Sequence, residues 1–130
     1  MASTVVPMDA PRTIPVTCSV TVANNEFVEI DPTDGQLDAI GAANTGRIGV
    51  ALADGVATDE VSVAIEGIFL CLNSTGGTLE IGDTVYAKDG TSLDAGSTGD
   101  RPVGTIVGPL SSNADAANVH VQLAYPLAVK

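Results

Sequence analysis

The only histidine of the chain, His120, is the first candidate for acid–base or nucleophilic chemistry. It lies in a segment where apolar and polar residues alternate, on the face opposite Val119 and Val121, so a solvent-facing or subunit-contacting side chain is expected. Together with this histidine, the two cysteines Cys18 and Cys71 lack the spacing of zinc ligands. They are expected to be small buried thiols, and whether they pair depends on the fold. No Gly-x-Ser-x-Gly elbow occurs, so the sequence predicts no catalytic residue.

Three short loops share features with ligand-binding motifs without completing them. The acidic stretch 31–35 lacks the alternating carboxylates and the closing glutamate of a calcium loop, and its Asp-Gly pair predicts a hairpin turn. Gly76 and Gly77 are followed by no lysine before Lys88, so they do not form a phosphate-binding loop. Asn73 begins a formal glycosylation sequon, which is interpreted as a turn. The sequence therefore predicts neither a metal site nor a cofactor.

Charge narrows the classes of partner. The 130 residues include 5 Lys plus Arg and 16 Asp plus Glu, which gives a formal net charge of −11. Nucleic acids and anionic membrane surfaces attract Lys and Arg, so neither is expected as a partner. Apolar residues make up 45% of the chain, which favours a single folded domain, and no run is long enough to cross a membrane. The rings available for stacking are few, namely Phe27, Phe69, Tyr86 and Tyr125.

Period-two alternation is the dominant pattern and predicts β-strands with one solvated face. It occurs at residues 16–22, 61–65 and 119–123. Shorter apolar runs predict more deeply buried strands at residues 27–30, 48–52, 68–72, 84–87 and 103–107. Short strands separated by Gly, Asp and Asn turns, without a long helix, are typical of a small all-β barrel or sandwich.

The first fifteen residues differ from the rest. Pro7, Pro11 and Pro15 recur every fourth position, and each biases the preceding residue toward an extended conformation. A helix is excluded there and a central strand is unfavourable. We expect residues 1–15 to form an extended N-terminal arm and residues 16–130 a single β-barrel domain. A plain disordered tail is the alternative reading of the first segment.

The remainder contains an internal repeat. Residues 27–39 and 84–95 both read as a strand, an Asp-Gly turn and a Leu-Asp-Ala strand, and each continues into a strand that contains a glycine, Gly49 or Gly104. A glycine within a strand marks a bulge or a close approach of another backbone. Each copy is interpreted as a β-meander, and two pseudo-repeated meanders are expected to close one barrel.

These segments, in this order, resemble a known family. The strings at 46–52 (GRIGVAL), 61–69 (VSVAIEGIF), 82–86 (GDTVY), 102–107 (PVGTIV) and 119–123 (VHVQL) look like those of bacteriophage capsid cement, or head decoration, proteins. The lambda-like head decoration proteins are more distantly similar. The resemblance extends over about residues 20 to 124. Unlike this chain, members of the family often begin with an apolar strand almost at once.

The resemblance implies a β-barrel of the tulip type that forms homotrimers and has no enzymatic activity. It implies a structural virion protein, assembled in the host cytoplasm, that binds the major capsid protein on the outer surface of an icosahedral capsid. Shell stabilisation is assigned to the arm, with Arg12 expected to contact an acidic partner. The expected capsid-binding residues are Val5, Val6, Pro7, Met8, Pro11, Arg12 and Ile14. The alternative is a trimeric β-domain of a tail fibre or surface adhesin that binds a glycan or receptor, which clustered rings or a cation site would favour.

Overall fold

Strands are the only regular secondary structure in the part of the chain that this computed structural model describes, so the all-β prediction is confirmed. That part comprises residues 6–7, 12–40, 47–87, 89–91, 93–94, 101–109, 113–114 and 116–123. The strands are β1 (Val6–Pro7), β2 (Arg12–Thr17), β3 (Phe27–Ile30), β4 (Leu37–Ala39), β5 (Arg47–Ala51), β6 (Glu60–Leu72), β7 (Thr84–Ala87), β8 (Leu93–Asp94), β9 (Arg101–Gly108) and β10 (Asn118–Leu123).

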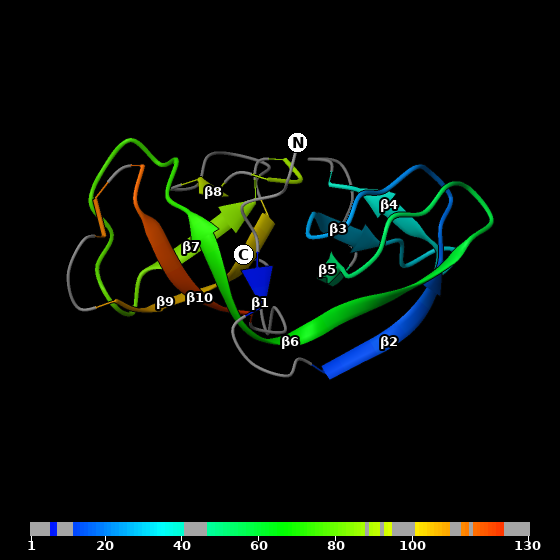
Figure 1. Ribbon diagram of the computed structural model, residues 1–130, viewed down its shortest axis with the longest axis horizontal. Coiled ribbons are helices and arrows are strands. Elements are labelled where there is room, and N and C mark those ends of the chain that lie inside the picture. Colours follow the sequence, from blue (N-terminus) through cyan, green and yellow to red (C-terminus); the bar gives the residue numbers. More distant parts are fainter. Residues whose placement is uncertain are drawn as a thin grey trace.

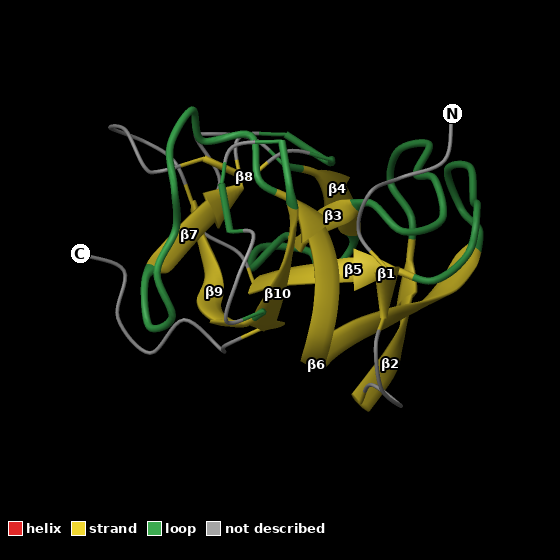
Figure 2. Ribbon diagram, turned by 60° about the vertical axis from the view of Figure 1, so that its left-hand side comes forward, coloured by secondary structure: helices red, strands yellow, loops and turns green. Residues whose placement is uncertain are grey.

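The strands form one curled antiparallel sheet. Its order is β4-β3-β5-β6-β10-β9-β7-β8, with β1 and β2 also paired to β6. Figures 1 and 2 show β3 to β5 on one side of the molecule and β7 to β10 on the other, joined by β6. The sequence predicted one closed barrel. Among the described residues, the end strands β4 and β8 do not pair with each other, so the sheet is a half-barrel.

The centre of the sheet is a strand that the sequence predicted as two. β6 runs without interruption through Gly67, whose φ is +130°. Ala64 pairs with both β5 and β2, and Leu70 pairs with both β10 and β1. Because a strand residue has one neighbour on each edge, β2 lies along β6 opposite β5, and β1 lies along β6 opposite β10. β6 is therefore flanked on both edges in each of its halves.

The sheet encloses two separate apolar clusters instead of the one barrel core that was expected. One contains Val16, Cys18, Val22, Val28, Leu37, Ala51, Val61, Val63 and Ile65. The other is larger and contains Phe69, Cys71, Leu79, Val85, Ala87, Leu93, Val103, Ile106, Val119, Val121 and Leu123, together with Phe27, Ile48, Val50 and Ala64. The outward faces of β3 and β5 contribute to this second cluster, which joins the two sides of the molecule.

The predicted strand at 16–22 is only partly correct. β2 ends at Thr17, and beyond it only the isolated bridges of Cys18 with Leu37 and of Val22 with Gly55 continue the pairing. Val20, predicted to share a buried face with its neighbours, is 38% exposed. The backbone of Cys18 is instead hydrogen-bonded to residues 58–59 of the loop that precedes β6. Apolar and polar residues alternate as far as Val22, but the continuous backbone pairing ends at Thr17.

The two cysteines are free and buried, as expected, and they lie in different clusters. Burial raises the pKa of the Cys71 thiol to about 12, and burial together with the charge of Asp59 raises the pKa of Cys18. Both thiols therefore stay protonated at neutral pH. Because the thiolate is the reactive species, both are expected to be unreactive in the folded protein.

We therefore expect neither thiol of the native protein to react with a water-soluble disulfide reagent at pH 8, whereas both react in guanidinium chloride. Because the pKa of Cys71 is higher in the folded protein, this residue's contribution to stability is complete below pH 9 and is lost as the pH rises toward 12. The reactivity of the two thiols is measured by thiol titration of native and denatured samples. Rapid labelling of the native chain would contradict the burial.

Candidate functional site

The expected capsid-binding residues are distributed over two strands and the residues around them. Val6 and Pro7 form β1, whose backbone pairs with β6. Arg12 and Ile14 belong to β2. The remaining three, Val5, Met8 and Pro11, lie outside the described residues. The N-terminal segment therefore pairs with the sheet in two places.

Arg12 is the most accessible of these side chains that the structure describes. Its Nη1 atom lies 3.8 Å from Oε1 of Glu66, and the two side chains are 71% and 52% exposed. An ion pair of this length between exposed side chains contributes little to stability, because solvent screens it. The guanidinium is therefore available to an acidic partner. Nothing in the sequence indicated Glu66, since the contact depends on the register of β2 against β6.

Burial increases along β2 toward the body of the protein. Arg12, Thr13 and Pro15 are exposed, Ile14 is partly buried and packs on the first cluster, and Val16 is buried within it. Proline is tolerated in an edge strand where its missing N–H faces away from the ladder. β2 is thus an edge strand whose first residues present side chains to solvent.

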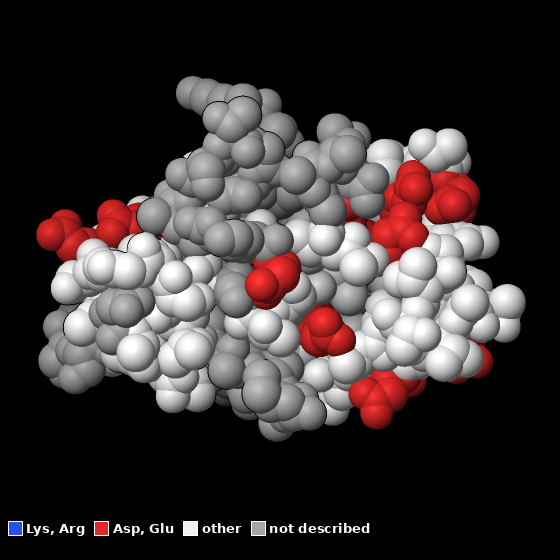
Figure 3. Space-filling model, turned by 90° about the horizontal axis from the view of Figure 1, so that it is seen from above, with Lys and Arg blue, Asp and Glu red and all other residues white. Residues whose placement is uncertain are grey.

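Acidic side chains surround this body, mostly in turns. Figure 3 shows separate groups of Asp and Glu on the described part of one face, with no Lys or Arg visible among them. Many of these carboxylates cap backbone N–H groups. Oδ1 of Asp31 accepts a hydrogen bond from the Thr33 N–H at 2.7 Å, and Oδ1 of Asp34 accepts one from Gln36 at 2.9 Å. The hairpin turn predicted at 31–35 is confirmed, and no group of three metal-ligating side chains occurs among the described residues.

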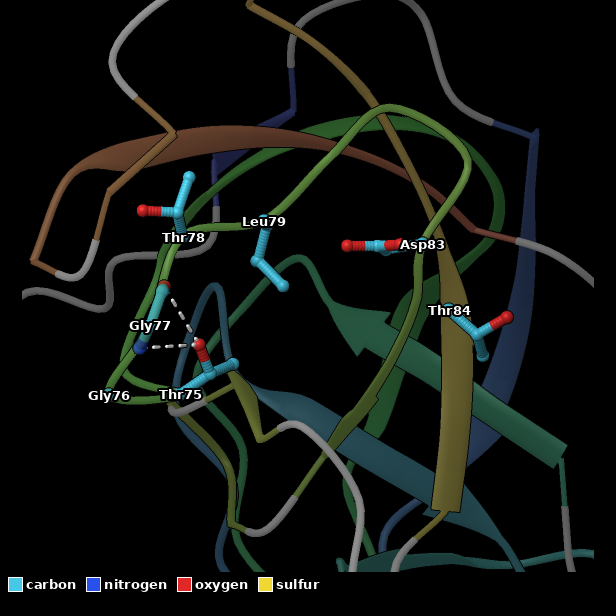
Figure 4. Close-up of a pocket in the computed structure, with 7 residues that line it drawn as sticks. All are labelled: Thr75, Gly76, Gly77, Thr78, Leu79, Asp83 and Thr84. Atoms are coloured by element: carbon cyan, nitrogen blue, oxygen red, sulfur yellow. Dashed lines mark hydrogen bonds between the residues drawn. The ribbon is translucent and has the colours of Figure 1, made fainter.

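A polar pocket of about 460 Å³ lies beside the loop 75–79 and residues 83–84, on the side of the molecule that contains β7 (Figure 4). Leu79 and Asp83 point into it, and Thr84 points away. Its polar groups serve the local turns. The Thr75 hydroxyl lies 3.2 Å from the Gly77 carbonyl, and the Asp83 carboxylate accepts the N–H of Glu80 at 2.8 Å. The pocket is therefore built from turn-forming groups.

The pocket loop is organised by a residue whose importance the sequence did not indicate. Asn73 is completely buried, and its amide donates to the carbonyls of Gly77 and Asn113 at 2.8 and 2.9 Å. Its Oδ1 accepts the backbone N–H and the hydroxyl of Thr75. The sequon that begins at Asn73 is a turn, as predicted, but the side chain is the centre of that turn. His120 is partly buried in β10, against Gly108.

The fold and the N-terminal strands together define a class: a small all-β protein with a curled antiparallel sheet, whose N-terminal strands β1 and β2 pair with the central strand β6. Among the described residues, no helix has the length and apolar character needed to cross a membrane. The family model for phage cement protein matches residues 8–123, and the chain belongs to this family. Its members are structural proteins of phage capsids. Among curated proteins, none matches the chain.

Proposed function

We propose that the protein decorates the outer surface of an icosahedral phage capsid as a homotrimer and stabilises the shell through its N-terminal segment. The observation that carries this proposal is membership of the phage cement family over almost the whole chain. The partner is the major capsid protein, and the protein has no enzymatic role. The contact residues are those of the arm, Val5, Val6, Pro7, Met8, Pro11, Arg12 and Ile14.

Strand addition supplies the binding mechanism. An extended peptide that joins an exposed sheet edge gains main-chain hydrogen bonds without any catalytic group. The pairing of Val6 and Pro7 with β6 supports this, because it demonstrates that the segment can adopt strand geometry despite its prolines. Three such segments in one trimer would raise the effective concentration of each after the first has bound.

The acidic body fits a display role. A net charge of −11 keeps a densely arrayed protein soluble and prevents it from competing for the packaged genome. The exposed Arg12 is the only Lys or Arg among residues 1–46 and can pair with a carboxylate on the shell. The negative charge therefore lies on the body of the protein, where it repels nucleic acid, whereas the N-terminal segment that contacts the shell is nearly neutral.

Deletion of residues 1–11 tests the proposal. We expect the shortened protein to fold but to leave undecorated, expanded heads of the parent phage bare. The reason is that β1 and five of the seven proposed contact residues are lost while β2 to β10 are kept. Occupancy is measured by electron microscopy and by co-sedimentation with heads. Full decoration by the shortened protein would overturn the assignment of binding to this segment.

A further inference from the structure

The N-terminal segment meets β6 in two contacts of very different extent. β1 pairs only Val6 and Pro7, whereas β2 pairs six residues and buries Val16. A two-residue strand has few backbone hydrogen bonds, so its local opening requires little free energy. β1 can therefore leave β6 far more readily than β2 can.

A repeated arrangement explains why β2 is fixed. We divide the body into a first unit, residues 12–66, and a second unit, residues 67–123. Every residue of the first cluster has a buried counterpart 55 to 58 positions later. In order, Val16, Cys18, Val22, Val28, Leu37, Ala51, Val61, Val63 and Ile65 correspond to Cys71, Asn73, Leu79, Val85, Leu93, Ile106, Val119, Val121 and Leu123.

The loops of the two units are tied down in the same way. The backbone of Cys18 exchanges two hydrogen bonds with residues 58–59, at 2.7 and 2.8 Å. The backbone of Asn73 exchanges two with residues 116–117, at 2.8 and 2.7 Å. Thr58 and Ala116, at corresponding positions, both have positive φ, 77° and 66°. Positive φ is uncommon outside glycine, so its recurrence at the same place is a specific match.

This correspondence gives β2 a defined place in the fold. In the first unit, β2 pairs with the first half of β6, with Val16 opposite Val61. In the second unit, the second half of β6 pairs with β10, with Cys71 opposite Val119. β2 is thus the counterpart of a central strand segment. A strand that closes one unit's own apolar cluster cannot detach without exposing that cluster to water.

We infer that the two units are copies of one β-meander and that β1 is a resting contact on β6 that opens on binding, whereas the chain from Arg12 onward stays paired. Residues 12–15 then belong to the body, and Arg12 acts from there through its exposed side chain. The register shift between Arg12 and Thr13 lies at this boundary. The inference rests on the proposed capsid binding and adds that binding requires the pairing of Val6 with Leu70 to open.

A disulfide staple tests the release. Val6 and Leu70 are directly opposed in the ladder, a placement that suits a cross-strand disulfide. We expect the Val6→Cys/Leu70→Cys double variant, oxidised, to fold normally and to lose binding to undecorated expanded heads, and dithiothreitol to restore it. Unchanged binding of the oxidised protein would overturn the inference. A failure to form the bond within one chain, judged on non-reducing gels, would also overturn it, because the resting contact would then not exist.

A second staple within β2 is the matched control. Pro15 and Ser62 are opposed and both exposed. Oxidised Pro15→Cys/Ser62→Cys protein should decorate heads as fully as its reduced form, and a loss of binding would move the boundary beyond residue 15. If the reduced forms of both variants and the unaltered protein all fail to bind heads, the proposed function fails instead. Thermal unfolding of each sample establishes that the variants are folded.

Discussion

Substitution of Gly104 by alanine is expected to destabilise the protein by about 3 kcal/mol, the upper part of the range for overpacking a close contact. Gly104 lies in β9 between Val85 of β7 and Leu123 of β10. A Cβ atom at this position would overlap the backbone carbonyl of Gln122. Because this obstacle is backbone within a ladder, it can move only if the pairing of β9 with β10 opens. Thermal unfolding should show a decrease in Tm of about 10 °C.

The control for Gly104→Ala is Gly77→Ala. Gly77 has ordinary φ, and a Cβ atom added to it meets nothing within 4 Å. Its substitution should change the free energy of unfolding by less than about 0.5 kcal/mol. Gly49→Ala should resemble Gly104→Ala in direction, since its Cβ would lie 2.8 Å from the Ala64 carbonyl oxygen. Equal stability of Gly104→Ala and Gly77→Ala would refute the close approach.

Asn73→Ala is the second substitution with a large expected effect, again about 3 kcal/mol. It removes four side-chain hydrogen bonds of a completely buried amide, while the carbonyls of Gly77 and Asn113 keep their second donors, the Thr75 hydroxyl and the Leu79 N–H. Each hydrogen bond contributes about 0.5–1.5 kcal/mol, and relaxation of the loop recovers part of the sum. Equilibrium denaturation in guanidinium chloride measures the difference.

Asn73→Asp separates the hydrogen bonds from the packing. The introduced carboxylate keeps the shape and the acceptor toward Thr75 but directs negative charge at two carbonyl oxygens. The carboxyl group must be protonated to donate a hydrogen bond. The loss in free energy of unfolding caused by Asn73→Asp should therefore shrink as the pH falls toward about 4, whereas the loss caused by Asn73→Ala should not. The control is Asn24→Ala, because Asn24 is exposed. A pH-independent deficit for Asn73→Asp would mean that the two donor contacts contribute nothing.

The sequence predicted the features that depend on neighbouring residues. Four of the ten strands, β3, β4, β7 and β8, lie within predicted segments, and β2, β5, β6, β9 and β10 overlap them, since period-two alternation is set by the pleat of each strand. The turn at 31–35 followed from Asp and Gly, whose local geometry needs no partner. The close approach at Gly49 and Gly104 is confirmed, although the sequence did not say which backbone comes close. The sequence also predicted buried thiols, because small apolar side chains in alternating strands face the core.

The candidate contact segment could be predicted only as a string of residues. The prolines indicated extended backbone before residue 16, but the same composition fits a free arm, a tail or an edge strand. The pairing of Arg12 with Glu66, and of Val6 with Leu70, joins residues more than fifty positions apart. Such contacts depend on register, which a one-residue slip would change completely. For this reason the ion pair and the resting place of β1 were not foreseen.

By itself, the sequence determined the strand character, the acidic net charge, the turns and the family of this protein. Only the tertiary structure decided that β6 is one strand, that the apolar core divides into two clusters of which the larger joins the two sides of the molecule, and that Asn73 holds a loop by four hydrogen bonds. The physical reason is the range of the interactions. Side-chain alternation and turn conformation are local, whereas backbone ladders and the enclosure of apolar surface require partners that the fold alone brings together.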